Sequence, residues 1–172
     1  TIFSDMLFKD ILKYNGGIAN ICEKIIGNIK DADTVEKSVD KVHIDWFEHG
    51  KRLLKKATEK GEEIGIKVTS PLNDGDILYE DAERIIVVEL DPCELIEIPV
   101  RDTVEMGRLC FEIGNRHISP AIEPKRVRIP YDEPTMDYLL RLGFKATRMH
   151  DKFSGYIECR GHSHGGHEHS HE

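Results

Sequence analysis

Five histidines lie within ten residues near the end of the chain, spaced by Ser, Gly and Glu: His162, His164, His167, His169 and His171. Neutral imidazole nitrogens are good ligands for divalent nickel, zinc and copper. The small spacers allow a flexible chain to fold several rings around one ion. The alternatives are an engineered tag or a merely solvated tail, but a tag is usually an unbroken run of histidines. The spaced pattern therefore favours metal binding.

A sixth histidine, His117, ends the sequence Gly-Asn-Arg-His at residues 114–117, directly after a predicted helix. A lone histidine is more often structural or exposed than a ligand, and one imidazole cannot fill a four- or six-coordinate shell. In a two-fold dimer with His117 near the axis, two imidazoles would meet. Tail histidines of both chains would then complete the shell, which is a geometric possibility rather than a deduction.

The remaining histidines are weaker candidates for metal ligation. His43 lies on the charged face of a predicted strand, and His49 follows Trp46 near the expected end of that strand. His150 stands beside Asp151 near the end of the last predicted strand, where it is a candidate for docking the tail. For His43 and His49 the expected role is that of a surface residue.

Motifs for catalysis are absent from the sequence. It contains no G-x-S-x-G, no phosphate-binding G-x-x-x-x-G-K-[ST] and no H-E-x-x-H. We therefore expect that the protein is not an enzyme and has no nucleotide site of its own. If a nucleotide drives its work, a partner hydrolyses that nucleotide.

The charge pattern argues against nucleic-acid and membrane partners. The formal net charge is −8, and Lys and Arg are interleaved with Asp and Glu, whereas a phosphate backbone requires clustered cations. No run approaches the roughly 20 apolar residues that span a bilayer. Charges at Asp5, Lys9, Asp10 and Lys13 interrupt any signal-peptide core. We therefore expect a cytoplasmic location.

The four cysteines show no C-x-x-C spacing, and they are Cys22, Cys93, Cys110 and Cys159. Zinc-finger spacing is likewise absent. In a reducing compartment we expect four free thiols, mostly buried.

The pattern along the chain predicts four segments. Residues 1–20 form an extension in which apolar residues recur near helical spacing. Residues 21–92 show short alternating runs with a turn about every ten residues, which is typical of a small β-domain. Asp91-Pro92 marks the domain boundary. Residues 154–172 are almost without apolar side chains, so we expect a flexible His-rich tail that is disordered without metal. In the β-domain, strands are expected at residues 42–46, 63–68, 77–79 and 84–90.

In residues 93–153 the sequence pattern predicts helices as well as strands. Strands are expected at residues 94–100, 118–123, 126–130 and 145–153, and helices at residues 103–115 and 135–142. One apolar face of the first helix is assigned to Val104, Leu109, Cys110 and Ile113. The order β-α-β-β-α-β is that of a ferredoxin-like unit. The chain as a whole is therefore expected to belong to the α+β class.

Residues 21–171 resemble the UreE urease accessory family. The sharpest match covers residues 109–120, with Gly-Asn-Arg-His at its centre. Residues 103–107, 128–132 and 139–143 also fit the C-terminal domain of the family. In the N-terminal part, residues 23–28 look like the usual first strand of the family.

This resemblance implies an N-terminal domain similar to the peptide-binding domain of Hsp40 co-chaperones and a ferredoxin-like C-terminal domain that forms a homodimer. It also implies that His117 of each protomer binds one nickel ion at the interface, with tail histidines adding ligands or a metal reserve. The implied partners are the urease accessory GTPase and apo-urease, to which Ni(II) is delivered as cargo. The expected function is that of a nickel metallochaperone.

The residues themselves leave alternatives open. Imidazole sites bind Cu(II) more tightly and Zn(II) comparably, so nickel follows from the resemblance alone. The tail fits a cytoplasmic metal-storage or detoxification protein without a dedicated client equally well. A metal-dependent hydrolase would need an open coordination position and a base, and none is visible. The placed His117 favours delivery, because a site shared between chains can open when a partner displaces one of them.

Overall fold

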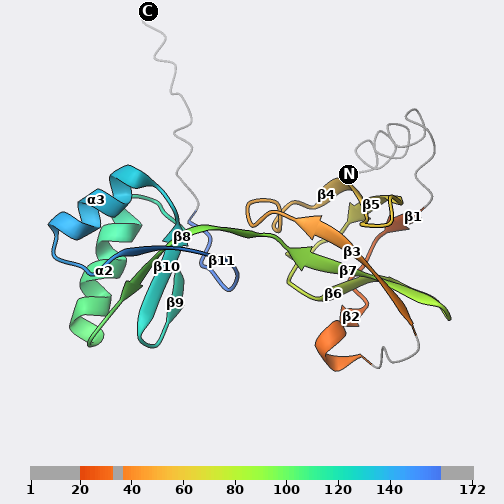
Figure 1. Cartoon of the computed structure of the whole chain (residues 1–172), viewed down its shortest axis with the longest axis horizontal. Helices are drawn as coiled ribbons and strands as arrows, with labels where there is room; N and C mark the ends of the chain where they lie inside the picture. Colours follow the sequence, from red (N-terminus) through yellow and green to blue (C-terminus); the bar gives the residue numbers. More distant parts are fainter. Residues whose placement is uncertain (1–19, 33–36, 160–172) are drawn as a thin grey trace, which may run out of the picture. The chain divides into compact units, whose positions relative to one another are not determined.

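The computed structural model describes residues 20–32 and 37–159, and these divide into two compact units. The first unit extends to Pro92 and the second begins at Cys93 (Figure 1). The predicted helical extension at residues 1–19 and the His-rich residues 160–172 lie outside the described residues. Each unit is described by itself below.

The first unit consists of two small sheets and a short 3-10 helix. One sheet has the strand order β1-β5-β4 and the other the order β2-β6-β7-β3. Most pairings are antiparallel, but β1 runs parallel to β5 and β3 runs parallel to β7. The elements are β1 (Asn20–Cys22), β2 (Gly27–Asn28), η1 (Ile29–Asp31), β3 (Ser38–Ile44), β4 (Leu53–Ala57), β5 (Glu63–Lys67), β6 (Asp76–Glu80) and β7 (Arg84–Leu90).

Alternation along the strands builds the core of this unit. In β3, Val42 and Ile44 are buried while His43 is exposed, as the sequence pattern predicts. Aliphatic residues from both sheets share one apolar cluster with them, including Ile64, Ile66, Leu72, Ile86, Val88 and Leu90. The two sheets therefore form one layered β-unit around a common core.

Three details of this unit differ from expectation. Residues 23–28 are not one strand, because the chain leaves one sheet after Cys22 and enters the other at Gly27. The basic stretch after Lys51 contains the unexpected strand β4. Its lysines hide the strand pattern, and in the structure they extend from β4 to carboxylates, with Lys56 Nζ 2.5 Å from Glu48. The strand expected at residues 42–46 also ends earlier, at Ile44.

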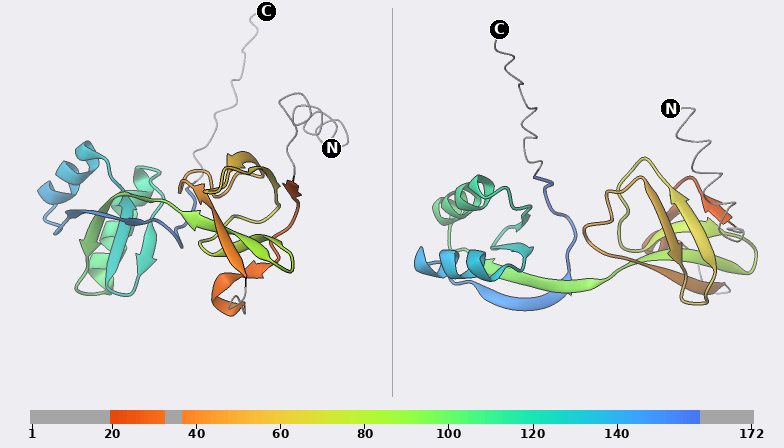
Figure 2. Two further views of the ribbon diagram at one scale, coloured as in Figure 1. Left: turned by 45° about the vertical axis from the view of Figure 1, so that its right-hand side comes forward. Right: turned by 90° about the horizontal axis from the view of Figure 1, so that it is seen from above.

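The second unit contains a four-stranded sheet with the order β11-β8-β10-β9 and two helices (Figure 2). Its elements are β8 (Pro92–Pro99), α2 (Thr103–Asn115), β9 (Ala121–Glu123), β10 (Arg126–Pro130), α3 (Glu133–Arg141) and β11 (Thr147–Lys152). This order of elements is the predicted one. Both helices pack on the same face of the sheet, because Leu109 and Ile113 of α2 and Leu139 of α3 share a cluster with Ile98 and Val127.

Both helices begin after an aspartate cap; α2 begins at the expected residue, whereas α3 begins at Glu133, two residues before the expected start. Asp102 accepts a hydrogen bond from the N–H of Glu105 at 2.8 Å, and Asp132 accepts one from the N–H of Thr135 at 3.0 Å. The expected apolar face of α2 is wrong at Val104, which is 71% exposed because it precedes the part of the helix that packs on the sheet. The strand expected from residue 118 begins at Ala121, and residues 116–120 form a connection instead.

Within the described part of the chain, none of the helices is long and apolar enough to cross a membrane.

A tight turn before β6 offers a test of this fold. Gly75 has φ +85°, and a Cβ placed there would lie 2.9 Å from Asn28 Oδ1 and 3.0 Å from Ile29 Cγ2. Gly61 has the same φ of +85° but open space around it. We expect Gly75→Ala to lower the free energy of unfolding by roughly 2–3 kcal/mol, from backbone strain plus overpacking. Gly61→Ala should cost about 1 kcal/mol. Urea unfolding of both variants measures the difference, and equal losses would contradict the close approach.

Candidate metal site

The end of α2 places His117. The N–H of Ile118 donates to the carbonyl of Ile113 at 3.3 Å, and the N–H of His117 donates to the carbonyl of Gly114 at 3.0 Å. These two hydrogen bonds are the Schellman pattern, which ends a helix with one residue in the left-handed region. That residue is His117, with φ 55°.

The other helix of this unit ends in the same way with a different residue type. At the end of α3, Phe144 donates to Leu139 at 3.1 Å and Gly143 donates to Leu140 at 3.0 Å. The left-handed position is Gly143, with φ 87°. Glycine is the usual residue there because its missing Cβ removes the steric cost, which is about 1 kcal/mol for other residues. Residue 117 is a histidine despite this steric cost, so the left-handed position carries an imidazole.

The residues on both sides of His117 are held in place. The Arg116 guanidinium lies 3.9 Å from the ring centroid of Tyr138, in cation–π contact. The Tyr138 hydroxyl donates to Glu112 Oε2 at 2.6 Å, and this hydrogen bond raises the pKa of Tyr138. Ile118 packs against the core of the unit. The backbone of His117 is therefore fixed, while its side chain is exposed to solvent.

This position suits a cation. The carbonyl end of a helix carries partial negative charge, which favours a cation near its last turn. An exposed imidazole there can ligate a divalent metal. Among residues 20–32 and 37–159, no three His, Cys, Asp or Glu side chains gather in a metal-binding group.

The structure gives the other described histidines different surroundings. His43 Nδ1 lies 2.6 Å from Asp91 Oδ1 and its Nε2 lies 3.0 Å from Glu59 Oε1. Hydrogen bonding to Asp91, and then to Glu59, raises the pKa of His43. Both of its nitrogens are thus engaged by carboxylates. His49 lies in the turn after β3 and contacts the carbonyl of Leu72 at 3.2 Å.

His150 is exposed in β11, two residues before the end of that strand, as expected. The predicted tail ligands His162, His164, His167, His169 and His171 lie outside the described residues. Of the six predicted metal ligands, the structure therefore positions His117 alone.

The cysteines are free thiols in the structure, as predicted. Burial raises the pKa of Cys22 to about 11 and also raises the pKa of Cys110. Cys22 is buried, but the other three are only partly so, which corrects the expectation that most are buried. Cys159 lies beside the loop that follows His117, a placement that its position in the sequence does not reveal.

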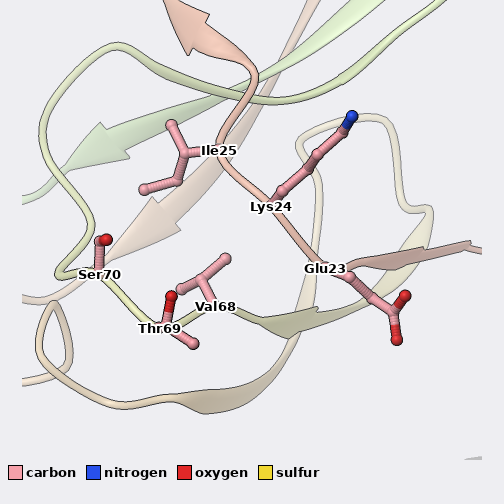
Figure 3. Close-up of a pocket in the computed structure, with 6 residues that line it drawn as sticks. All are labelled: Glu23, Lys24, Ile25, Val68, Thr69 and Ser70. Atoms are coloured by element: carbon pink, nitrogen blue, oxygen red, sulfur yellow. The ribbon is translucent and has the colours of Figure 1, made fainter.

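A shallow pocket in the first unit does not supply a metal site. In Figure 3, the charged ends of Glu23 and Lys24 extend away from the apolar side chains of Ile25 and Val68. No histidine or cysteine is among its lining residues, which are Glu23, Lys24, Ile25, Val68, Thr69 and Ser70. The candidate chemistry therefore stays with the second unit.

Over residues 20–32 and 37–159, fold and site together define a two-unit α+β protein, mostly sheet with two helices, in which His117 stands exposed at the end of α2. Residues 22–91 match the UreE urease accessory protein N-terminal domain, and residues 93–172 match the C-terminal domain of the same family. The chain therefore belongs to the UreE urease accessory protein family. This confirms the resemblance found at residues 109–120.

Curated relatives agree with this assignment. Urease accessory protein UreE of Bifidobacterium longum subsp. infantis is 39% identical over 144 residues, which cover 83% of this chain and 65% of that protein. UreE of Acetivibrio thermocellus is 35% identical over 150 residues, covering 84% of this chain and 98% of that protein. UreE of Helicobacter pylori strain 26695 is 33% identical over 129 residues, covering 72% and 76%.

The left-handed backbone at residue 117 makes a prediction for stability. His117→Gly should be at least as stable as the unchanged protein and about 1 kcal/mol more stable than His117→Ala, because alanine keeps the strain. In α3, Gly143→Ala should lose about 1 kcal/mol for the same reason. Thermal and urea unfolding of the three variants provide the measurement. Equal stabilities of His117→Gly and His117→Ala would show that the left-handed conformation does not constrain this position.

Proposed function

We propose that this protein is a metallochaperone that binds Ni(II) reversibly through His117 and passes the ion on for assembly of the urease metallocentre. The observation that supports the proposal is the exposed imidazole at a backbone position that otherwise favours glycine. Glycine would occupy this left-handed position with less strain, and the His117 side chain is exposed. The imidazole is therefore better explained by binding than by stability of the fold.

A homodimer would give the ion a second imidazole. On α2, Val104 is 71% exposed and Phe111 is 66% exposed. They are seven residues apart, which is two helical turns, so they lie on the same face of the helix. Two large apolar side chains on the helix that ends at His117 support an interface between copies beside that residue. Tail histidines would complete the shell.

The topology supports a ferredoxin-like fold for the second unit. The four strands occur in the chain as β8, β9, β10 and β11, and the sheet order β11-β8-β10-β9 places the first and third in the middle. The β10 pairings with β8 and β9 are antiparallel. For the first unit, membership of the family supports the likeness to the peptide-binding domain of Hsp40 co-chaperones.

The proposed cargo is Ni(II), with Zn(II) and Cu(II) able to occupy the same imidazole ligands. Membership of a urease accessory family supports apo-urease as the client and the urease accessory GTPase as the partner, and it supports a cytoplasmic location. In this scheme the GTPase hydrolyses the nucleotide, and this chain contributes ligands rather than catalysis. Transfer requires the shared site to open when a partner replaces one set of ligands.

Nickel titration of a His117 variant tests the proposal. His117→Gly should lose the tight site, with affinity falling at least about tenfold, because one substitution removes both symmetric imidazoles of a dimer. The weaker sites of the tail should persist. Calorimetry on the full chain measures both, and urease activation in cells should fall in parallel.

His150→Ala is the matched control, since it removes an exposed imidazole of the same unit. It should bind nickel as the unchanged protein does. Unaltered nickel affinity and full urease activation with His117→Gly would refute the role of His117. Loss of tight binding without loss of activation would instead favour a storage protein.

A charge on the exposed face of α2 tests the homodimer. Phe111→Glu should shift the protein from a mass of about twice 19.7 kDa to the monomer mass, because two carboxylates would face each other across a two-fold axis. Light scattering of the apo-protein gives the mass. Arg141→Glu, an exposed change at the end of α3, is the control for added negative charge. A protein that is monomeric without any substitution would contradict the proposed interface.

A further inference from the structure

A single residue separates the last strand of the first unit from the first strand of the second. Strand β7 ends at Leu90 and β8 begins at Pro92, so Asp91 lies between them and is called the junction residue below. Its N–H donates to the carbonyl of Ile44, at the end of β3, at 3.0 Å. Its carboxylate is held as well, because Asp91 Oδ1 lies 2.6 Å from His43 Nδ1. The freedom of the junction residue therefore depends on contacts with β3.

His43 presents its ring on the outer side of β3. It lies between Val42 and Ile44, which are buried in the core, whereas its own side chain is 45% exposed. The second ring nitrogen, Nε2, lies 3.0 Å from Glu59 Oε1. Glu59 is fixed beside β3, because its N–H donates to the carbonyl of Lys41 at 2.8 Å. The ring thus connects the junction residue with the turn between β4 and β5.

Both contacts of the ring are satisfied only when it carries two protons. An ionised carboxylate can only accept hydrogen bonds, so each contact requires an N–H from the ring. A neutral imidazole has one N–H, whereas an imidazolium has two. In the neutral ring, the lone pair of one nitrogen would face a carboxylate and repel it. Hydrogen bonding to Asp91 and to Glu59 accordingly raises the pKa of His43.

The other charged groups beside the ring pair with each other. On β7, Glu89 is the register partner of His43. Lys41 precedes His43 by two residues on β3, and its Nζ lies 3.0 Å from Glu89 Oε2. Their charges offset one another, which leaves Asp91 and Glu59 as the carboxylates that the ring serves. Histidine is also the side chain whose ordinary pKa lies between pH 5 and 8. In that range the proton on His43 therefore sets the charge balance of the group.

We propose that His43 is a proton-operated clasp on the junction residue: the protonated ring holds Asp91 and Glu59 together, and loss of the proton opens the clasp. The shorter contact keeps the remaining N–H, so Nδ1 stays bonded to Asp91 while Nε2 releases Glu59. The hold on Asp91 also weakens, because the attraction between two full charges is lost. The junction residue then keeps its backbone hydrogen bond to Ile44 but loses its connection to the β4–β5 turn.

The clasp acts on the junction and not on the stability of the whole unit. Ion pairs that are about half exposed contribute little to stability and are screened by salt. Because the pKa of His43 is raised in the folded state, the contribution of the clasp is fully present below about pH 6.5. It is lost as the pH rises through the pKa of the folded protein. A rise in pH therefore frees the junction residue while the core of the unit stays packed.

Backbone mobility at Asp91 and Glu59 tests the clasp. In NMR relaxation of the metal-free full chain at about pH 6, both amides should have order parameters near about 0.85, the value of rigid backbone. At about pH 8.5 both order parameters should be lower, because the ring is then neutral. His43→Gln removes the titrating ring, so each amide should show the same mobility at both pH values. An Asp91 order parameter that is independent of pH in the unchanged protein, or that changes equally in His43→Gln, would overturn the proposal.

Lys41→Gln is the matched control, since it changes a charge on the same side of β3 and leaves the ring in place. It should retain the pH dependence of both amides. Loss of that dependence in Lys41→Gln would assign the effect to the general charge of this surface and would also overturn the clasp.

Titration of the ring itself provides a measurement that keeps His43 in the chain. In NMR spectra of the carbon-bound ring protons, His43 should titrate above about pH 6.5. Asp91→Asn should lower its pKa, and Glu59→Gln should lower it by less, because the hydrogen bond to Asp91 is the larger cause of the shift. Both variants keep the size of the side chain. A pKa of His43 that stays the same in both variants would show that the carboxylates do not hold the ring, and the proposal would fail.

Discussion

Two backbone hydrogen bonds at the end of α2 fix residue 117 in a left-handed conformation, and the geometry of the candidate site depends on them. They set the direction in which the chain leaves the helix, and so they place Ile118 in the core and the imidazole in solvent. The cation–π contact of Arg116 with Tyr138 connects the same turn to α3. A ligand on such a turn needs little further ordering when it binds an ion, because the folding of the domain has already fixed its backbone.

The same connection, residues 116–120, also contacts the chain after β11, because the N–H groups of Ile157 and Cys159 donate to Pro120 and Ser119. One short segment therefore links three parts of the second unit: the helix that ends at His117, the edge strand β9 that follows, and the chain beyond β11. The core packs on one face of the sheet, and Arg128, between two core residues of β10, contacts Asp151 and Lys152 on the other. Elements far apart in the sequence thus meet at the candidate ligand.

Much of this fold could be predicted from sequence, and the failures have physical causes. The order of elements in the second unit follows from periodicity, from Asp102 before the first helix and from Pro134 at the start of the second. The strand β4 was missed because its lysines form surface ion pairs and mask the alternation. For the site, the residue type and its position after a helix identified His117, but its backbone conformation was not apparent because glycine is the usual signal. The pairing of Tyr156 with Ala121 joins residues about 35 apart, and no local pattern in residues 154–159 predicts it.

The histidine in a glycine position also has a consequence for how such sequences diverge. Under the proposed metal-binding role, selection for the ion and selection for stability oppose each other at residue 117. In a descendant that no longer carried metal, the first would vanish, and the steric preference of the helix end would favour drift toward Gly or Asn. Replacement of His117 would then be an early sign that metal binding had been lost. The surrounding fold and the family resemblance would remain unchanged.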